Sequence, residues 1–85
     1  MNKKEIENSI DSHRLEITTA TGNKAYIEIV FNDYEEYHVR PYANNGSGET
    51  YLEGHSYYTD DKDDAIGTAQ LMIKEYETKG VRYSA

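Results

Sequence analysis

The histidines are the residues of this chain whose type could bind a metal or a small ligand. His38 and His55 fall within segments of alternating apolar and polar residues, so both could lie on one side of a sheet beside Glu36 or Glu53. Zinc sites usually show closely spaced ligands, but the chain has no cysteine and no His-x-x-x-His pair. We therefore expect no metal and no other cofactor, and we interpret these histidines as polar residues of a solvated face.

The acidic run Asp60-Asp61-Lys62-Asp63-Asp64 is the next candidate, since it has the composition of a calcium-binding loop. An EF-hand loop needs glycine at its sixth position and glutamate at its twelfth, and neither residue lines up here. The aspartates stand directly before a segment with helical periodicity, where the helix dipole favours negative charge. We interpret them as a helix start that needs no ion.

The acids and serines do not have the spacing of catalytic groups. Glu35 and Glu36 would face opposite sides of a strand, so they cannot share a proton in one pocket. Ser47 and Ser56 lack the G-x-S-x-G pattern of a nucleophile elbow, and residues 46–48 lack the lysine of a phosphate loop. Because 85 residues also leave little room for an enclosed pocket, we expect no catalytic residues and a protein that is not an enzyme.

Helices are predicted at both ends of the chain. A capping-box pattern followed by isoleucines one turn apart predicts a short helix over residues 3–12. A longer helix, capped by Thr59 or Asp60, should end before Gly80, because apolar residues recur there at helical spacing. Leu71 points away from that apolar stripe, so we expect its side chain to be exposed.

Three to four antiparallel strands are predicted between the helices. Alternating side chains place them at residues 14–19, 25–31, 34–42 and 49–58. Pro41 cannot donate a ladder hydrogen bond, so it should lie near a strand end or an edge. With both helices on one face, the chain forms a single domain over residues 1–85, a two-layer α+β fold in the order α-β-β-β-β-α. The other face should carry tyrosines, carboxylates and histidines: Tyr26, Glu28, Glu36, His38, Tyr42, Tyr51, Glu53, His55 and Tyr57.

The net charge of -7 is concentrated in the middle of the chain. Residues 25–64 contain ten acids against two bases, Arg40 and Lys62, a sum of -8. Proteins that bind nucleic acid need lysines and arginines for the phosphates, so we expect no direct contact with DNA or RNA. We expect instead a basic protein or a nucleoprotein complex as the partner.

The cellular location is suggested by two absences. The chain has no cysteine, which fits a reducing cytoplasm. The first residues lead into no apolar segment of a signal peptide, and no run of about 18 apolar residues occurs that could cross a membrane. We therefore expect a cytoplasmic protein that does not associate with membranes.

The acidic, tyrosine-rich middle of the chain permits two interpretations. In the first, the charge only keeps so small a protein in solution. Alternatively, carboxylates held on a rigid surface can imitate the spacing of phosphates and engage the arginines and lysines of a partner, with tyrosines as anchors. The residues expected to contact such a partner are Asp33, Glu35, Glu36, Glu49, Glu53, Asp60, Asp61, Asp63, Asp64, Tyr42 and Tyr51.

In its size, acidity and α+β layout the chain resembles the small phage-encoded inhibitors of bacterial defence, the anti-CRISPR and anti-restriction DNA mimics. The resemblance covers the general character of the whole chain and includes no diagnostic motif. It implies an inhibitor that occupies a nucleic-acid-binding surface of its target in the cytoplasm of the host cell. The order of elements also resembles that of double-stranded-RNA-binding domains, but here aspartates at residues 60–64 replace the basic helix start of those domains.

Two other functions remain open at this point. An assembly module would use the exposed Leu71 and an unpaired sheet edge for self-association. For the chain itself we expect a monomer or a weak homodimer. An accessory subunit or a small-molecule sensor would use the face that carries His38 and His55.

Overall fold

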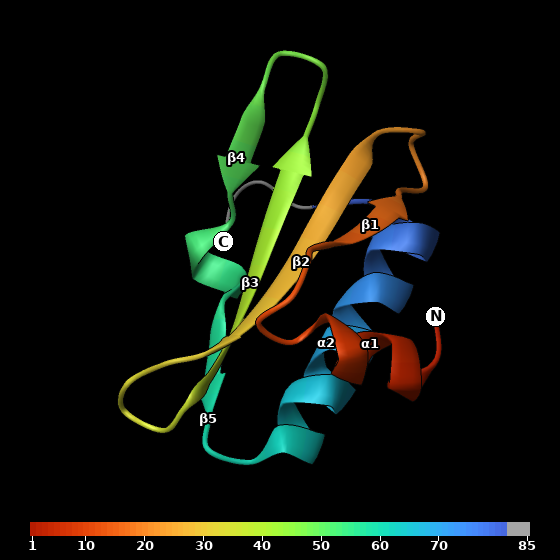
Figure 1. Ribbon diagram of the computed structural model, residues 1–85. Helices are drawn as coiled ribbons and strands as arrows, with labels where there is room; N and C mark the ends of the chain where they lie inside the picture. Colours follow the sequence, from red (N-terminus) through yellow and green to blue (C-terminus); the bar gives the residue numbers. More distant parts are fainter. Residues whose placement is uncertain (82–85) are drawn as a thin grey trace.

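Two helices lie on one face of an antiparallel sheet in the computed structural model, which describes residues 1–81 (Figure 1). The elements are α1 (Lys3–Ser9), β1 (Leu15–Thr18), β2 (Lys24–Phe31), β3 (Tyr37–Asn44), β4 (Glu49–Tyr51), the 3-10 turn η1 (Glu53–His55), β5 (Tyr57–Thr59) and α2 (Lys62–Lys79). The strands follow the order β1-β2-β3-β4. β5 pairs with the same edge of β3 as β4 does, but further along it. The expected two-layer α+β fold is confirmed.

The core lies between the sheet and α2, as the alternation of side chains predicts. β2 buries Ala25, Ile27 and Ile29, and α2 buries the apolar stripe that includes Ile66 and Ile73. The complete set of buried apolar residues is Ile6, Leu15, Ile17, Ala25, Ile27, Ile29, Val39, Ala43, Leu52, Ala65, Ile66, Ala69, Ile73 and Tyr76. Leu71, on the opposite side of α2, is 70% exposed, which confirms the prediction from helical spacing.

α1 has the predicted start but ends sooner than predicted. The capping box is present, since the Asn2 side chain accepts a hydrogen bond from the Glu5 N–H at 2.8 Å. The helix stops at Ser9 instead of continuing to residue 12, because Ile10 leaves the helical conformation with a ψ of 126° and Asp11 follows with a positive φ of 56°. Asp11 forms hydrogen bonds with β2: its N–H donates to the Ile29 carbonyl at 2.9 Å, and its carboxylate accepts from the Phe31 N–H at 3.0 Å.

The turn between β2 and β3 moves the third strand along the chain. The Asn32 side chain accepts hydrogen bonds from the N–H groups of Tyr34 and Glu36 at 2.9 and 3.0 Å, and Glu35 has a φ of 61°. These bonds hold residues 32–36 in a turn. β3 therefore covers Tyr37–Asn44, whereas the sequence predicted residues 34–42.

The predicted fourth strand, residues 49–58, is wrong as one strand, and the reason lies in Pro41. Pro41 is buried in the middle of β3, neither at a strand end nor at an edge. Its carbonyl accepts from the Leu52 N–H at 2.9 Å, but it has no N–H to return to the Leu52 carbonyl. That carbonyl accepts from the His55 N–H at 3.0 Å instead, which forms η1 and divides the edge into β4 and β5.

α2 begins one residue later than predicted. Asp61, not Thr59 or Asp60, is the N-cap, and its carboxylate accepts from the N–H groups of Asp63 at 2.8 Å and Asp64 at 3.3 Å. Gly80 follows the helix at a φ of 82°, and its N–H donates to the Tyr76 carbonyl. No helix within residues 1–81 is long and apolar enough to span a bilayer.

The N-cap assignment predicts a difference between two adjacent aspartates. We expect Asp61→Ala to lower the free energy of unfolding by about 1 kcal/mol, because two N–H groups lose their acceptor. Asp60→Ala removes the same charge without removing the cap and should change stability by less than about 0.5 kcal/mol. Urea denaturation of both variants measures the difference, and equal losses would contradict the assignment.

Candidate functional site

Carboxylates from two separate segments meet at one end of the molecule. The turn between β2 and β3 and the turn between β5 and α2 lie at the same end of the sheet, because Tyr37 pairs with Thr59 (Figure 1). Between them is an open hollow of about 620 Å³, lined by Tyr34, Glu35, Glu36, Thr59 and Asp60. We call this region the acidic end and define it by the carboxylates of Asp33, Glu35, Glu36, Asp60, Asp61, Asp63 and Asp64.

The carboxylates of the acidic end have no ion-pair partners among the residues that the structure describes. Lys62, the one base within the 60–64 run, turns toward α1, where its Nζ lies 2.7 Å from the Glu7 carboxylate. That contact lowers the pKa of Glu7 and raises the pKa of Lys62, mainly through their hydrogen bond. The side chain that could neutralise the acidic end is thus used elsewhere.

Two of the predicted contact residues lie apart from the acidic end. Glu49 stands at the start of β4, and its carboxylate forms an ion pair with Arg14 at 2.9 Å. Glu53 lies in η1, between β4 and β5. The predicted contact surface is therefore divided: most of its unpaired carboxylates lie at the acidic end, while Glu49 is paired and Glu53 lies apart.

Tyr42 and Tyr51 belong to the side of the sheet that the helices leave uncovered, which we call the open face. It is formed by Tyr26, Glu28 and Val30 of β2, His38, Arg40 and Tyr42 of β3, Tyr51 of β4 and Tyr58 of β5. Tyr26, Glu28, His38 and Tyr42 lie here as the alternation of β2 and β3 predicts.

The predicted open face is wrong for four residues. Glu36 lies in the turn before β3. Glu53 and His55 belong to η1, where the His55 Nδ1 lies 3.3 Å from the hydroxyl of the buried Tyr76. Tyr57 lies on the helix side and donates a hydrogen bond to the Asp64 carboxylate at 2.6 Å. Because η1 shifts the alternation, Tyr58 takes the outward position instead, with its ring stacked on His38 at 3.9 Å.

The sequence analysis missed two arginines that organise the open face. The Arg14 guanidinium lies 4.3 Å from the centre of the Tyr26 ring and 4.6 Å from that of Tyr42. Arg40 lies 5.5 Å from the Tyr51 ring and 3.5 Å from the Glu28 carboxylate. The open face is therefore a charge-balanced layer of tyrosines and arginines, not the tyrosine-carboxylate surface expected. The alternation placed Arg40 outward, but only the strand register shows what it contacts.

His38 sits inside this layer, between Tyr51 and Tyr58. Its Nε2 lies 3.3 Å from the Tyr51 hydroxyl, and its ring is covered by Tyr58. Burial lowers the pKa of His38, the charge of Arg40 lowers it further, and Glu28 acts in the opposite direction. The protonated imidazole is thus disfavoured in the folded protein.

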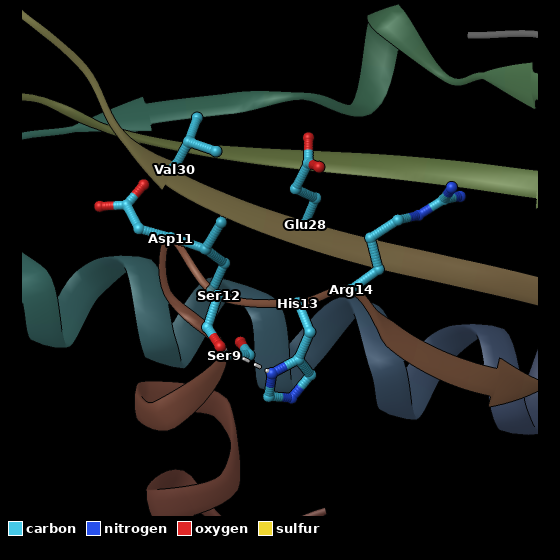
Figure 2. Close-up of a pocket in the computed structure, with 8 residues that line it drawn as sticks. Ser9, Asp11, Ser12, His13, Arg14, Glu28 and Val30 are labelled. Atoms are coloured by element: carbon cyan, nitrogen blue, oxygen red, sulfur yellow. Dashed lines mark hydrogen bonds between the residues drawn. The ribbon is translucent and has the colours of Figure 1, made fainter.

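A second hollow of about 450 Å³ lies beside β2, where β1 does not continue (Figure 2). Its lining is Ser9, Asp11, Ser12, His13, Arg14, Glu28, Ile29 and Val30. Ser12 and His13 come within 3.2 Å of each other through Oγ and Nδ1. The Asp11 carboxylate accepts from the Phe31 N–H and points away from the imidazole, so these side chains do not form a proton relay (Figure 2).

The stacking of Arg14 predicts a stability effect that charge alone would not give. We expect Arg14→Ala to lower the free energy of unfolding by about 1–2 kcal/mol, because two tyrosine rings lose their cover. Arg14→Lys keeps the charge but not the flat guanidinium, so it should recover less than half of that loss. If chemical denaturation shows that Arg14→Lys has the full wild-type stability, the ion pair with Glu49, and not the stacking, accounts for the effect of Arg14.

The lowered pKa of His38 predicts a pH dependence. The unfolded chain binds a proton near pH 6.5 but the folded protein binds it only at lower pH, so stability is complete above about 6.5 and falls as pH decreases through the folded pKa. We expect this loss to be smaller in His38→Gln. Urea unfolding from pH 8 to pH 5 measures it, and an NMR titration that placed the His38 pKa above that of a model peptide would contradict it.

Relatives of known function do not help to choose between these surfaces. Comparison with protein-family models, with curated proteins and with solved structures found no match to this chain. The function must therefore be argued from the two surfaces themselves, the unpaired acidic end and the charge-balanced open face.

Proposed function

We propose that this protein is a non-enzymatic binding protein whose acidic end receives a positively charged surface of another macromolecule. The observation that carries the proposal is that Glu35 and Glu36 of one turn and Asp60 of another line the same hollow, with Asp33, Asp61, Asp63 and Asp64 next to them in the chain. None of these seven carboxylates has an ion-pair partner in residues 1–81.

The acidic end is rigid, which favours recognition. Asn32 fixes the turn that carries Glu35 and Glu36, and Asp61 fixes the first turn of α2. Carboxylates held at fixed spacing attract a basic surface over long range and quicken association. Tyr34 stands among them with 83% of its surface exposed, in the position of an aromatic anchor.

The chemistry of such a surface suits a protein that normally holds nucleic acid. Lysines and arginines that contact phosphates could contact these carboxylates instead, and the bound complex would exclude DNA or RNA. The protein would then act as a cytoplasmic inhibitor of a nucleic-acid-processing complex, of the anti-CRISPR or anti-restriction kind, without catalysing a reaction. Direct nucleic-acid binding would be opposed by the charge of the acidic end.

Capture from a bacterial lysate tests this proposal with a matched pair of variants. We expect the wild-type chain to retain a basic nucleic-acid-processing protein that moderate salt releases and that added double-stranded DNA displaces. The acidic-end variant Glu35→Lys/Glu36→Lys/Asp60→Lys should lose that protein. Circular dichroism of the variant confirms that the fold is retained.

The control variant carries the same change in net charge at other sites. Glu53→Lys/Glu75→Lys/Glu77→Lys alters three exposed carboxylates away from the acidic end and should retain the captured protein. If both variants lose the captured protein, net charge alone explains the binding. If both retain it, the acidic end is not the contact surface.

An assembly module based on Leu71 is the weaker candidate. The side chain is 70% exposed, but Lys74, Glu75, Thr78 and Lys79 line the shallow surface around it. One leucine among charged residues offers far less apolar area than a stable interface requires. The acidic end therefore remains the better-supported surface.

A further inference from the structure

We propose that the open face is a self-complementary surface through which two copies of this chain associate, sheet against sheet. Both described helices cover the opposite side of the sheet, and no described element covers this one (Figure 1). The proposal goes beyond binding at the acidic end and uses none of its residues.

The balance of charge on the open face allows a second copy to approach it. The chain carries a net charge of -7, so two copies repel each other in most orientations. On the open face, however, Glu28 is matched by Arg40, and Glu49 at its margin by Arg14. A copy that approaches this side meets a surface without excess charge.

The register of β2 and β3 makes the face complementary to itself. Glu28 lies directly across from Arg40, and Tyr26 across from Tyr42. A two-fold axis parallel to the strands and between them places each β2 over the β3 of the other copy. Glu28 then faces the partner's Arg40, and the partner's Glu28 faces Arg40, so two new ion pairs form.

The same axis brings a protruding ring over a hollow. Val30, His38 and Tyr58 form one row across β2, β3 and β5, and Tyr58 is 54% exposed at the outer end of that row. Beyond Val30, at the other end, is the hollow beside β2 that Ser12 and His13 line (Figure 2). Rotation about the axis exchanges the two ends, so the Tyr58 of each copy lies over the hollow of the other.

The size of the face predicts a weak dimer. Strands of eight residues are roughly 26 Å long, and four strands side by side span roughly 20 Å. Each copy therefore presents a face of about 500 Å² to the other. Stable complexes bury about 1,600 Å² in total, so the dimer should form only at roughly 10–100 μM or above.

Charge reversal and mixing test the pairing directly. In sedimentation velocity up to about 1 mM, we expect the wild-type chain to dimerise, and Glu28→Arg and Arg40→Glu each to weaken association at least about tenfold. An equimolar mixture of the two variants should dimerise again, because each position then meets its opposite charge across the interface. A loss caused by misfolding would not be restored by mixing.

Two further variants keep the test decisive. If a charge variant does not fold, Tyr58→Ser should still weaken dimer association, because the hollow of the second copy then loses the ring that fills it. Leu71→Glu changes a residue on the helix side and should leave dimer association unchanged. A wild-type chain that stays monomeric at about 1 mM, a mixture that fails to dimerise, or a dimer lost in Leu71→Glu would overturn the proposal.

The two proposals fail separately. The acidic-end variant should keep self-association while losing the basic partner, and the charge variants of the open face should do the reverse. Loss of one activity alone therefore identifies which surface was assigned wrongly.

Discussion

The missing N–H of Pro41 is the constraint on which both surfaces depend. Because Pro41 cannot complete the ladder with Leu52, the Leu52 carbonyl turns to the His55 N–H and the edge of the sheet breaks at η1. In β5 the side chains alternate again between the two faces of the sheet, but shifted by one residue relative to an unbroken strand. Tyr58 then faces outward onto His38, while Tyr57 reaches the start of α2. An unbroken strand would have exchanged these two tyrosines.

Cross-strand geometry explains why unpaired charge gathers at one end. A carboxylate within the sheet has a fixed neighbour on the next strand, and for Glu28 that neighbour is Arg40. The carboxylates at residues 33–36 and 60–64 lie in turns or at a helix start, where no opposite strand supplies a base. The fold thus separates a balanced face from an acidic end within residues 25–64, which contain ten acids against two bases.

The errors of the sequence analysis have local causes. Several acceptors precede α2 in a row, and the spacing alone could not show that Asp61 caps the helix while the Thr59 hydroxyl accepts from the Asp61 N–H. The shift of β3 depends on one side chain, Asn32, which replaces backbone partners in the turn. In each case a side chain competed with the backbone for a hydrogen bond, and periodicity carries no information about that competition.

Sequence periodicity alone predicted the helix–sheet–helix arrangement, the buried side of β2 and α2 and the exposure of Leu71, because these follow from periods of two and 3.6 residues that need no distant contact. Only the tertiary structure decided which carboxylates are neutralised. Arg14 and Glu49 are far apart in the chain, and Lys62 leaves its neighbouring aspartates for Glu7. Such pairs depend on strand register and helix packing, which place distant side chains together.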